Sequence, residues 1–120
     1  MTGGERDLQR LLAQFDPRLS SQRYAFAEAE DSSLDDDAFA LIREAEGITA
    51  IRPSPDGSWA RISLGVHSSL EAVGLTATLS ARLAEAGISA NIVAARHHDH
   101  IFVPWDRRDE ALACLRPASV

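Results

Sequence analysis

The chain has 120 residues, of which 45% are hydrophobic and 25% charged, the composition of an ordinary globular domain. Its formal net charge is −6, which argues against nucleic acid as a partner, because affinity for phosphates comes largely from basic side chains. The single cysteine, Cys114, excludes an intrachain disulfide and a metal site built from several cysteines.

The sequence also predicts where the protein works. The amino terminus lacks the apolar core of a secretory signal, and no window approaches the ~20 apolar residues of a membrane-spanning helix. We therefore expect a cytoplasmic protein with no membrane partner. All of the basic residues are Arg and Ala is abundant, a bias that indicates a GC-rich bacterial genome.

The first half of the chain reads as a short helix followed by strands. Residues 5–15 place apolar side chains three and four apart, which predicts an amphipathic helix. Alternating or continuous apolar side chains predict strands over residues 23–30, 39–43 and 48–52. The segment 53–57, Pro-Ser-Pro-Asp-Gly, is the clearest turn in the sequence. It predicts a boundary between an N-terminal half, residues 1–57, and a C-terminal domain, residues 58–120.

The second unit begins with a strand over residues 59–66, followed by a long helix. Apolar side chains alternate along this strand, which predicts that Arg61 and Ser63 point to the face away from the core. Ser68 and Glu71 are spaced as a capping box, which predicts the start of the helix, and Gly87 predicts its end. Leucines every four residues form an apolar ridge, and alanines form a flat side that another helix can approach closely: Leu75, Leu79 and Leu83, then Ala77, Ala81 and Ala84.

Two strands and a last helix complete this unit. We expect the strands over residues 88–95 and 101–105, joined through His97-His98-Asp99-His100, with Asp106 as the cap of the helix. This βαββα order is that of an α+β, ferredoxin-like sandwich that lacks its final strand. We expect a strand of the N-terminal half, Tyr24–Ala29, to supply the missing edge of a mostly antiparallel sheet.

Three segments of the second unit carry a recognisable pattern: Leu64–Leu75, Leu83–Val93 and His98–Pro104. The most specific parts read V-H-S-S-L-E-A-V-G-L-T and H-D-H-I-F-V-P. This pattern resembles the ACT domain superfamily, and more narrowly small, stand-alone bacterial ACT-like proteins. The resemblance implies a ferredoxin-like, ACT-type fold, pairing into dimers through sheet edges and helices, and regulatory binding of amino acids at the interfaces.

The resemblance also implies a ligand site, formed by the loop after the first strand, the start of the helix and the adjoining strand. Matched residue by residue, it implicates His67, Ser68, Ser69, Val73, Gly74, Leu75, Asn91 and Ile92. A helix start offers amide donors for a carboxylate, and Asn91 adds an amide group. Gly65 would let a ligand approach the backbone closely if it faces the same crevice.

The histidine cluster supports a different hypothesis. His98 and His100 share one face of a strand at a spacing that suits zinc, and His97 lies beside them. An exposed histidine turn is the commoner arrangement, so we expect no metal and no cofactor. We expect no catalytic role either, since the sequence contains no nucleophile elbow, P-loop or G-x-G-x-x-G motif.

We therefore predict a non-catalytic regulatory module that binds a small ligand, an amino acid, and forms a homodimer. In the expected mechanism the ligand stabilises one dimeric arrangement, which a partner recognises. Two alternatives stay open. One is a ligand-free oligomerisation or protein-interaction module that uses the alanine side of the helix, and the other is a metal-binding module built on His97, His98 and His100.

Overall fold

The computed structural model describes residues 16–30, 37–64 and 73–116 of the chain. These residues form β1 (Arg18–Ala29), β2 (Ala40–Glu44), β3 (Gly47–Pro53), β4 (Trp59–Ser63), α2 (Val73–Glu85), β5 (Asn91–Ala94), β6 (Asp99–Pro104), a short 3₁₀ helix η2 (Trp105–Arg107) and α3 (Arg108–Leu115). Within them, no helix is long and apolar enough to cross a membrane.

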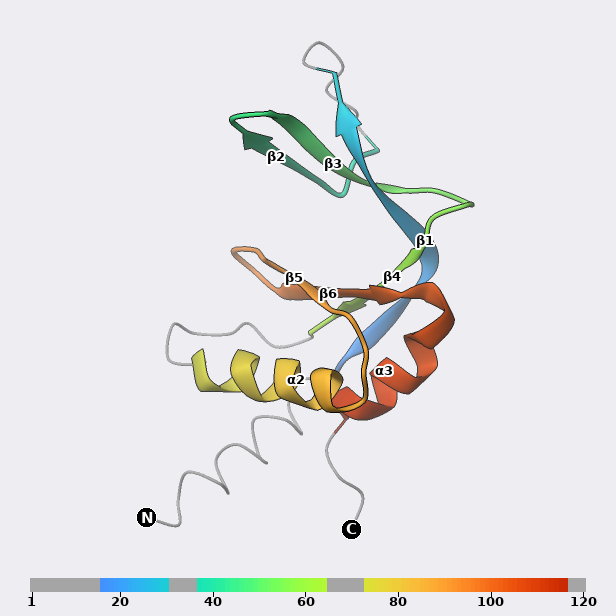
Figure 1. Cartoon of the computed structure of the whole chain (residues 1–120), viewed down its shortest axis with the longest axis vertical. Helices are drawn as coiled ribbons and strands as arrows, with labels where there is room; N and C mark the ends of the chain where they lie inside the picture. Colours follow the sequence, from blue (N-terminus) through green and yellow to red (C-terminus); the bar gives the residue numbers. More distant parts are fainter. Residues whose placement is uncertain (1–15, 31–36, 65–72, 117–120) are drawn as a thin grey trace.

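The strands form one antiparallel sheet with the order β2-β3-β1-β4-β6-β5. Helices α2 and α3 lie on one side of the β4–β6–β5 part, and the β2–β3 hairpin projects away from them (Figure 1). The order β1-β4-β6-β5 is that of a complete ferredoxin-like sheet with β1 in the place of the last strand. The predicted α+β, ferredoxin-like class is confirmed.

The strands predicted from the sequence are present, with shifted ends. β1 starts earlier than predicted, and β5 is shorter, because only Asn91–Ala94 pairs with β6. β6 starts at Asp99, inside the segment predicted as a connection. The predicted helix over residues 5–15 and the capping box of Ser68 and Glu71 lie outside the described residues.

Strand β1 joins the two halves of the sheet. Its later part, Tyr24–Ala29, pairs with β3, while its earlier part pairs with β4 from Arg18 to Tyr24. The expectation that the strand containing Tyr24–Ala29 completes the C-terminal unit is confirmed for the strand, but the part that pairs with β4 is Arg18–Tyr24 and not Tyr24–Ala29. The reason is length: β1 has 12 residues and β4 only 5, so β1 takes a different neighbour at each end.

The ladder between β1 and β4 contains a β-bulge. Leu19 pairs with Ile62 and Arg23 pairs with Ala60, so the residues 20–22 stand opposite a single residue of β4. A bulge of this kind bends the strand and increases its twist. It also lets the two ends of β1 follow differently oriented neighbours.

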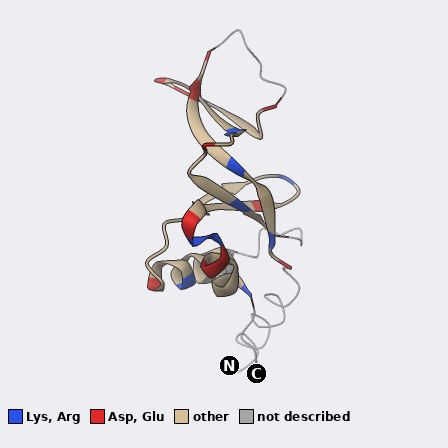
Figure 2. Cartoon of the chain, turned by 90° about the vertical axis from the view of Figure 1, so that its right-hand side faces the viewer, with Lys and Arg blue, Asp and Glu red and all other residues tan. Residues whose placement is uncertain are grey.

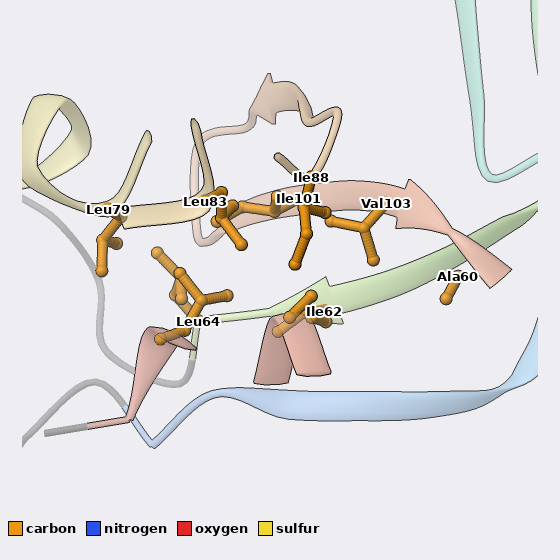
Figure 3. Packing of buried hydrophobic residues seen from close by; sticks show 10 residues of the cluster. Ala60, Ile62, Leu64, Leu79, Leu83, Ile88, Ile101 and Val103 are labelled. Atoms are coloured by element: carbon orange, nitrogen blue, oxygen red, sulfur yellow. The ribbon is translucent and has the colours of Figure 1, made fainter. Parts of the chain in front are cut away.

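The main apolar core fills the space between the sheet and the two helices (Figure 3). Its buried members are Ala60, Ile62, Leu64, Leu79, Leu83, Ile88, Ile101, Val103, Ala111 and Leu115. The alternation predicted for the β4 segment and the ridge formed by Leu79 and Leu83 are thus confirmed. The side chain of Leu75 lies outside the described part, and the three alanines of the flat helix side are exposed.

Gly87 ends α2, as predicted. Its φ of 71° lies in the left-handed region that favours glycine. Ile88 N donates to Leu83 O at 2.9 Å, the long hydrogen bond of a Schellman motif. Arg107 of η2 donates to Ala86 O at 2.9 Å, so the end of α2 is tied to the start of the last helix.

A cluster of aromatic rings lies on the opposite, helix-free face of the sheet. Tyr24 packs edge-on against Phe39 and Phe102, at ring-centroid distances of 6.0 and 5.6 Å. Phe26 meets Trp59 and Phe102 at 5.6 and 5.3 Å. These contacts connect β1 and the approach to β2 with β4 and β6, so the sheet is curled onto its own helix-free face.

Gly57 allows the turn after β3 to pass close to β1. A Cβ atom at this position would lie 2.2 Å from Tyr24 O, so backbone would have to move. We expect Gly57→Ala to lower the free energy of unfolding by about 1–3 kcal/mol, the usual cost of overpacking, as measured by urea denaturation.

Gly87→Ala is the comparison. Nothing lies within 4 Å of a Cβ added there, so only the left-handed backbone adds a cost, about 1 kcal/mol. A smaller loss of stability for Gly57→Ala than for Gly87→Ala would contradict the close approach of the turn to β1.

Candidate functional site

Arg61 lies at the centre of a hydrogen-bonded chain of side chains on the helix-free face. Its Nε donates to Tyr24 Oη at 3.0 Å, and its Nη1 donates to Ser63 Oγ at 2.8 Å. Ser63 Oγ lies 2.7 Å from His100 Nδ1. We call these four residues the Arg61 network.

The strand register explains why these side chains meet. Residues directly opposite one another in an antiparallel pair share a face of the sheet. Ser63 stands opposite His100 in the β4–β6 pair, and Tyr24 stands opposite Trp59 in the β1–β4 pair. Arg61 lies between Trp59 and Ser63 at alternate positions of β4, so three strands bring the network to one face.

Arg61 is a half-buried cation held between aromatic rings. Its guanidinium carbon lies 4.6 Å from the ring centroid of Phe39 and 5.3 Å from that of Tyr24. Contacts of this kind contribute about 0.5–1 kcal/mol each. Among the described residues no carboxylate pairs with this guanidinium. Because none of the described carboxylates neutralises this charge, the position suits the carboxylate or phosphate of a ligand.

The contact between Ser63 and His100 fits a neutral ring. Ser63 Oγ accepts from Arg61, and its hydroxyl can donate to His100 Nδ1; in that arrangement the ring proton lies on Nε2. Burial lowers the pKa of His100 below its ordinary value of 6.5, and the nearby charge of Arg61 lowers it further. The uncharged ring is therefore favoured at neutral pH, and in this tautomer it is a donor through Nε2.

The structure describes only part of the ligand site predicted from the sequence. Gly65, His67, Ser68 and Ser69 lie outside the described residues. Val73, Gly74 and Leu75 form the first turn of α2, where only the backbone is described. Asn91 and Ile92 begin β5.

Asn91 lies on the same face as the Arg61 network. In the β5–β6 pair it stands opposite Phe102, and in the β4–β6 pair Phe102 stands opposite Arg61. The three residues therefore form one row across the sheet, and Asn91 is exposed. Ile92 points the other way and packs against the helix-side core. The structure thus brings Asn91 to the network and does not bring Ile92 there.

The histidine segment is divided between a turn and a strand. His97 and His98 are exposed in the β5–β6 turn, while Asp99 and His100 belong to β6. The rings of His98 and His100 are 6.4 Å apart. In the described part of the chain, no group of three His, Cys, Asp or Glu side chains is placed to hold a metal ion.

Sequence reasoning missed the Arg61 network. The alternation of β4 correctly assigned Arg61 and Ser63 to the face away from the core, but it did not indicate what faces them. That information lies in the pairing of β4 with β1 and β6, which places Tyr24 and His100 alongside. The available signal was an Arg and a Ser at alternate positions of a strand whose other face is apolar.

Two sequence models of the ACT domain match the chain, one over residues 3–64 and the other over residues 55–117. Each match spans just over half of the chain. Matches to the ACT domain suggest a regulatory ligand-binding module. The chain belongs to the ACT domain family, whose members are typically non-catalytic, often bind small ligands and often dimerise.

Solved structures share this fold. A protein of unknown function from Vibrio cholerae, described as a possible transport protein, is 37% identical, with a TM-score of 0.77 over 100% of both chains. Protein Atu0741 from Agobacterium tumefaciens is 13% identical, with a TM-score of 0.69 over 82% of this chain and 84% of its own.

The regulatory subunit of aspartate kinase from Thermus thermophilus, in its ligand-free form, is also similar. It is 9% identical, with a TM-score of 0.62 over 89% of this chain and 99% of its own. At this identity, as for the Agobacterium protein, the likeness shows the fold alone. No curated protein matches the sequence.

The lowered pKa of His100 predicts a pH dependence of stability. Because the folded pKa lies below the unfolded value of 6.5, the unfolded chain takes up the proton first as the pH falls. The stability contributed by the neutral ring is complete above that value and is lost as the pH falls below it. We expect His100→Asn, which keeps an acceptor for Ser63 but does not titrate, to lose less stability on acidification.

Thermal unfolding midpoints of the two proteins, measured from about pH 8 to about pH 5, check this. The difference between them should be constant at the alkaline end and change only below the ordinary pKa of histidine. Parallel curves over the whole range would contradict a role for His100.

Proposed function

We propose that this ACT protein is a regulatory module that binds an amino acid on the helix-free face of its sheet. The observation that carries the proposal is the half-buried guanidinium of Arg61, which shares that face with exposed Asn91 and has no carboxylate partner among the described residues. Arg61 and His100 Nε2 would donate to the ligand carboxylate, and Asn91 Oδ1 would accept from its α-amino group.

The spacing of the strands supports this arrangement. Arg61 and Asn91 lie on either side of Phe102, on the two strands that flank β6. Adjacent strands are about 4.8 Å apart, so the two strands lie about 10 Å from each other. A long Arg side chain, a short Asn side chain and the main-chain part of an amino acid can together span this distance.

We propose that residues after β4 add further contacts. His67, Ser68 and Ser69 come soon after Ser63 in the sequence and are implicated by the ACT resemblance, together with Gly65. The first turn of α2, Val73–Leu75, follows in the sequence. Because α2 lies on the side of the sheet away from Arg61 (Figure 1), these residues are proposed on the resemblance alone.

We also propose how binding is transmitted. The ligand would stabilise one arrangement of a cytoplasmic homodimer and so shift a pre-existing equilibrium. Residues 1–57 and 58–120 would act as two ACT-like units of one chain. The two family matches, which share only residues 55–64, the turn after β3 and strand β4, support this division.

A thermal-shift screen against the twenty amino acids tests the proposal. A ligand at about 100 times its Kd adds about 2.7 kcal/mol to the free energy of unfolding and raises the Tm by several degrees. We expect one amino acid, or a chemically related group, to raise the Tm. Asn91→Ala should abolish this shift while leaving the Tm of the ligand-free protein nearly unchanged, because Asn91 is exposed.

Arg61→Gln should abolish the shift as well, since it removes the charge that binds the carboxylate. Arg96→Gln, the same change at an exposed position of the β5–β6 turn, is the matched control and should keep it. A flat panel would reject the proposal in favour of the oligomerisation module. A shift with zinc alone would favour the histidines, and a shift that survives Asn91→Ala would remove Asn91 from the site.

A further inference from the structure

An open hollow lies between the bulge of β1 and the turn after β3. It measures about 370 Å³ and is lined by Ser21, Gln22, Arg23, Pro53, Ser54 and Pro55. Small-molecule sites begin at about 300 Å³. The hollow is therefore large enough for a small ligand.

Backbone contacts hold both walls of the hollow. On one side the bulge places residues 20–22 opposite a single residue of β4, and Gln22 N donates to Ser20 Oγ at 3.2 Å. On the other side Ser54 N donates to Arg23 O at 2.9 Å, which ties the turn to the strand. Pro53 and Pro55 fix the backbone φ on either side of Ser54. A ligand would thus meet walls that are already ordered, which lowers the entropic cost of binding.

Arg23 is the one charged residue in the lining, and its guanidinium is fixed in place. Its Nε donates to Gly57 O at 2.7 Å, and its guanidinium carbon lies 5.0 Å from the ring centroid of Trp105. The side chain is half-buried. Among the described residues no carboxylate pairs with it, so its two Nη groups remain available as donors.

The ring of Trp105 contacts a second cation. Arg108 also lies over it, with its guanidinium carbon 3.9 Å from the ring centroid. An anion bound at Arg23 would offset part of this concentration of positive charge. The nearest acidic residue in sequence, Asp56, is exposed and is not part of the lining. Elsewhere in the described chain, acidic and basic residues are interspersed (Figure 2).

We propose that this hollow binds the carboxylate or phosphate group of a small molecule. Arg23 presents its two Nη groups as a fork that matches two oxygens of such an anion, and the hydroxyls of Ser21 and Ser54 supply further donors. Arg23 stands opposite Ala60, whose side chain belongs to the helix-side core, so it lies on the face away from Arg61. The two proposed sites thus use different cations on opposite faces, and they touch through Gln22 of the lining, whose Oε1 accepts from Tyr24 Oη at 3.3 Å.

The test is an NMR titration of the full chain with inorganic phosphate and, separately, with acetate, at constant ionic strength. We expect saturable shifts of the Arg23 Nε–H and of the Ser21 and Ser54 amides with at least one of the two anions. Saturation by phosphate alone identifies phosphorylated ligands, and saturation by acetate alone identifies carboxylates. No saturable shift with either anion would overturn the proposal.

Arg23→Gln keeps a donor for Gly57 O but removes the charged fork, so we expect the Kd to rise about tenfold or more. Arg96→Gln is the matched control and should leave the Kd unchanged. If Arg23→Gln fails to fold, Ser21→Glu serves instead. A carboxylate at this exposed position would pair with the guanidinium of Arg23 and so weaken the binding of the added anion. Unchanged binding in Arg23→Gln or Ser21→Glu, or an equal loss in Arg96→Gln, would overturn the proposal.

Discussion

The structure depends on one long strand that pairs on both sides. β1 hydrogen-bonds to β3 through its later residues and to β4 through its earlier ones, and this makes a single sheet of what the sequence presents as two units. Without it, the βαββα unit would lack its fourth strand and the β2–β3 hairpin would have no neighbour. A two-stranded hairpin is at best marginally stable in water. The pairing of β1 therefore determines both the completeness of the C-terminal unit and the stability of the N-terminal one.

The sheet curls around β1, and different kinds of side chain are buried on its two faces. The buried core on the helix side is aliphatic, whereas the helix-free side combines aromatic rings with Arg61, Ser63 and His100. A cation in such a place is costly unless its donors are satisfied. Here Tyr24 and Ser63 accept from it, and the rings of Tyr24 and Phe39 cover it. The helix-free face therefore combines a small buried core around Tyr24, Ile51 and Phe102 with polar side chains whose hydrogen bonds fix their directions.

Local chemistry explains what the sequence could predict. The end of α2 at Gly87, the turn at residues 53–57 and the alternation of β4 each depend on a few neighbouring residues. The Arg61 network could not be predicted in this way, because it depends on the register of strands far apart in the chain. The prediction that Asn91 and Ile92 both contact the ligand is a different case. Adjacent residues of a strand face opposite ways, so the alternation itself already argued that only one of them could contact a ligand on a given face.

The position of β4 has a consequence for how the chain folds. Both of its partners are distant in sequence: Ser63 pairs with Arg18 on one side and with His100 on the other. By contrast, β2 and β3 are joined by a tight turn, as are β5 and β6. Hairpins of that kind close small loops and form within microseconds, whereas non-local ladders must first overcome the entropy of closing long ones. The insertion of β4 between β1 and β6 is the step with the greatest topological cost, and the two hairpins can form and open many times before it occurs.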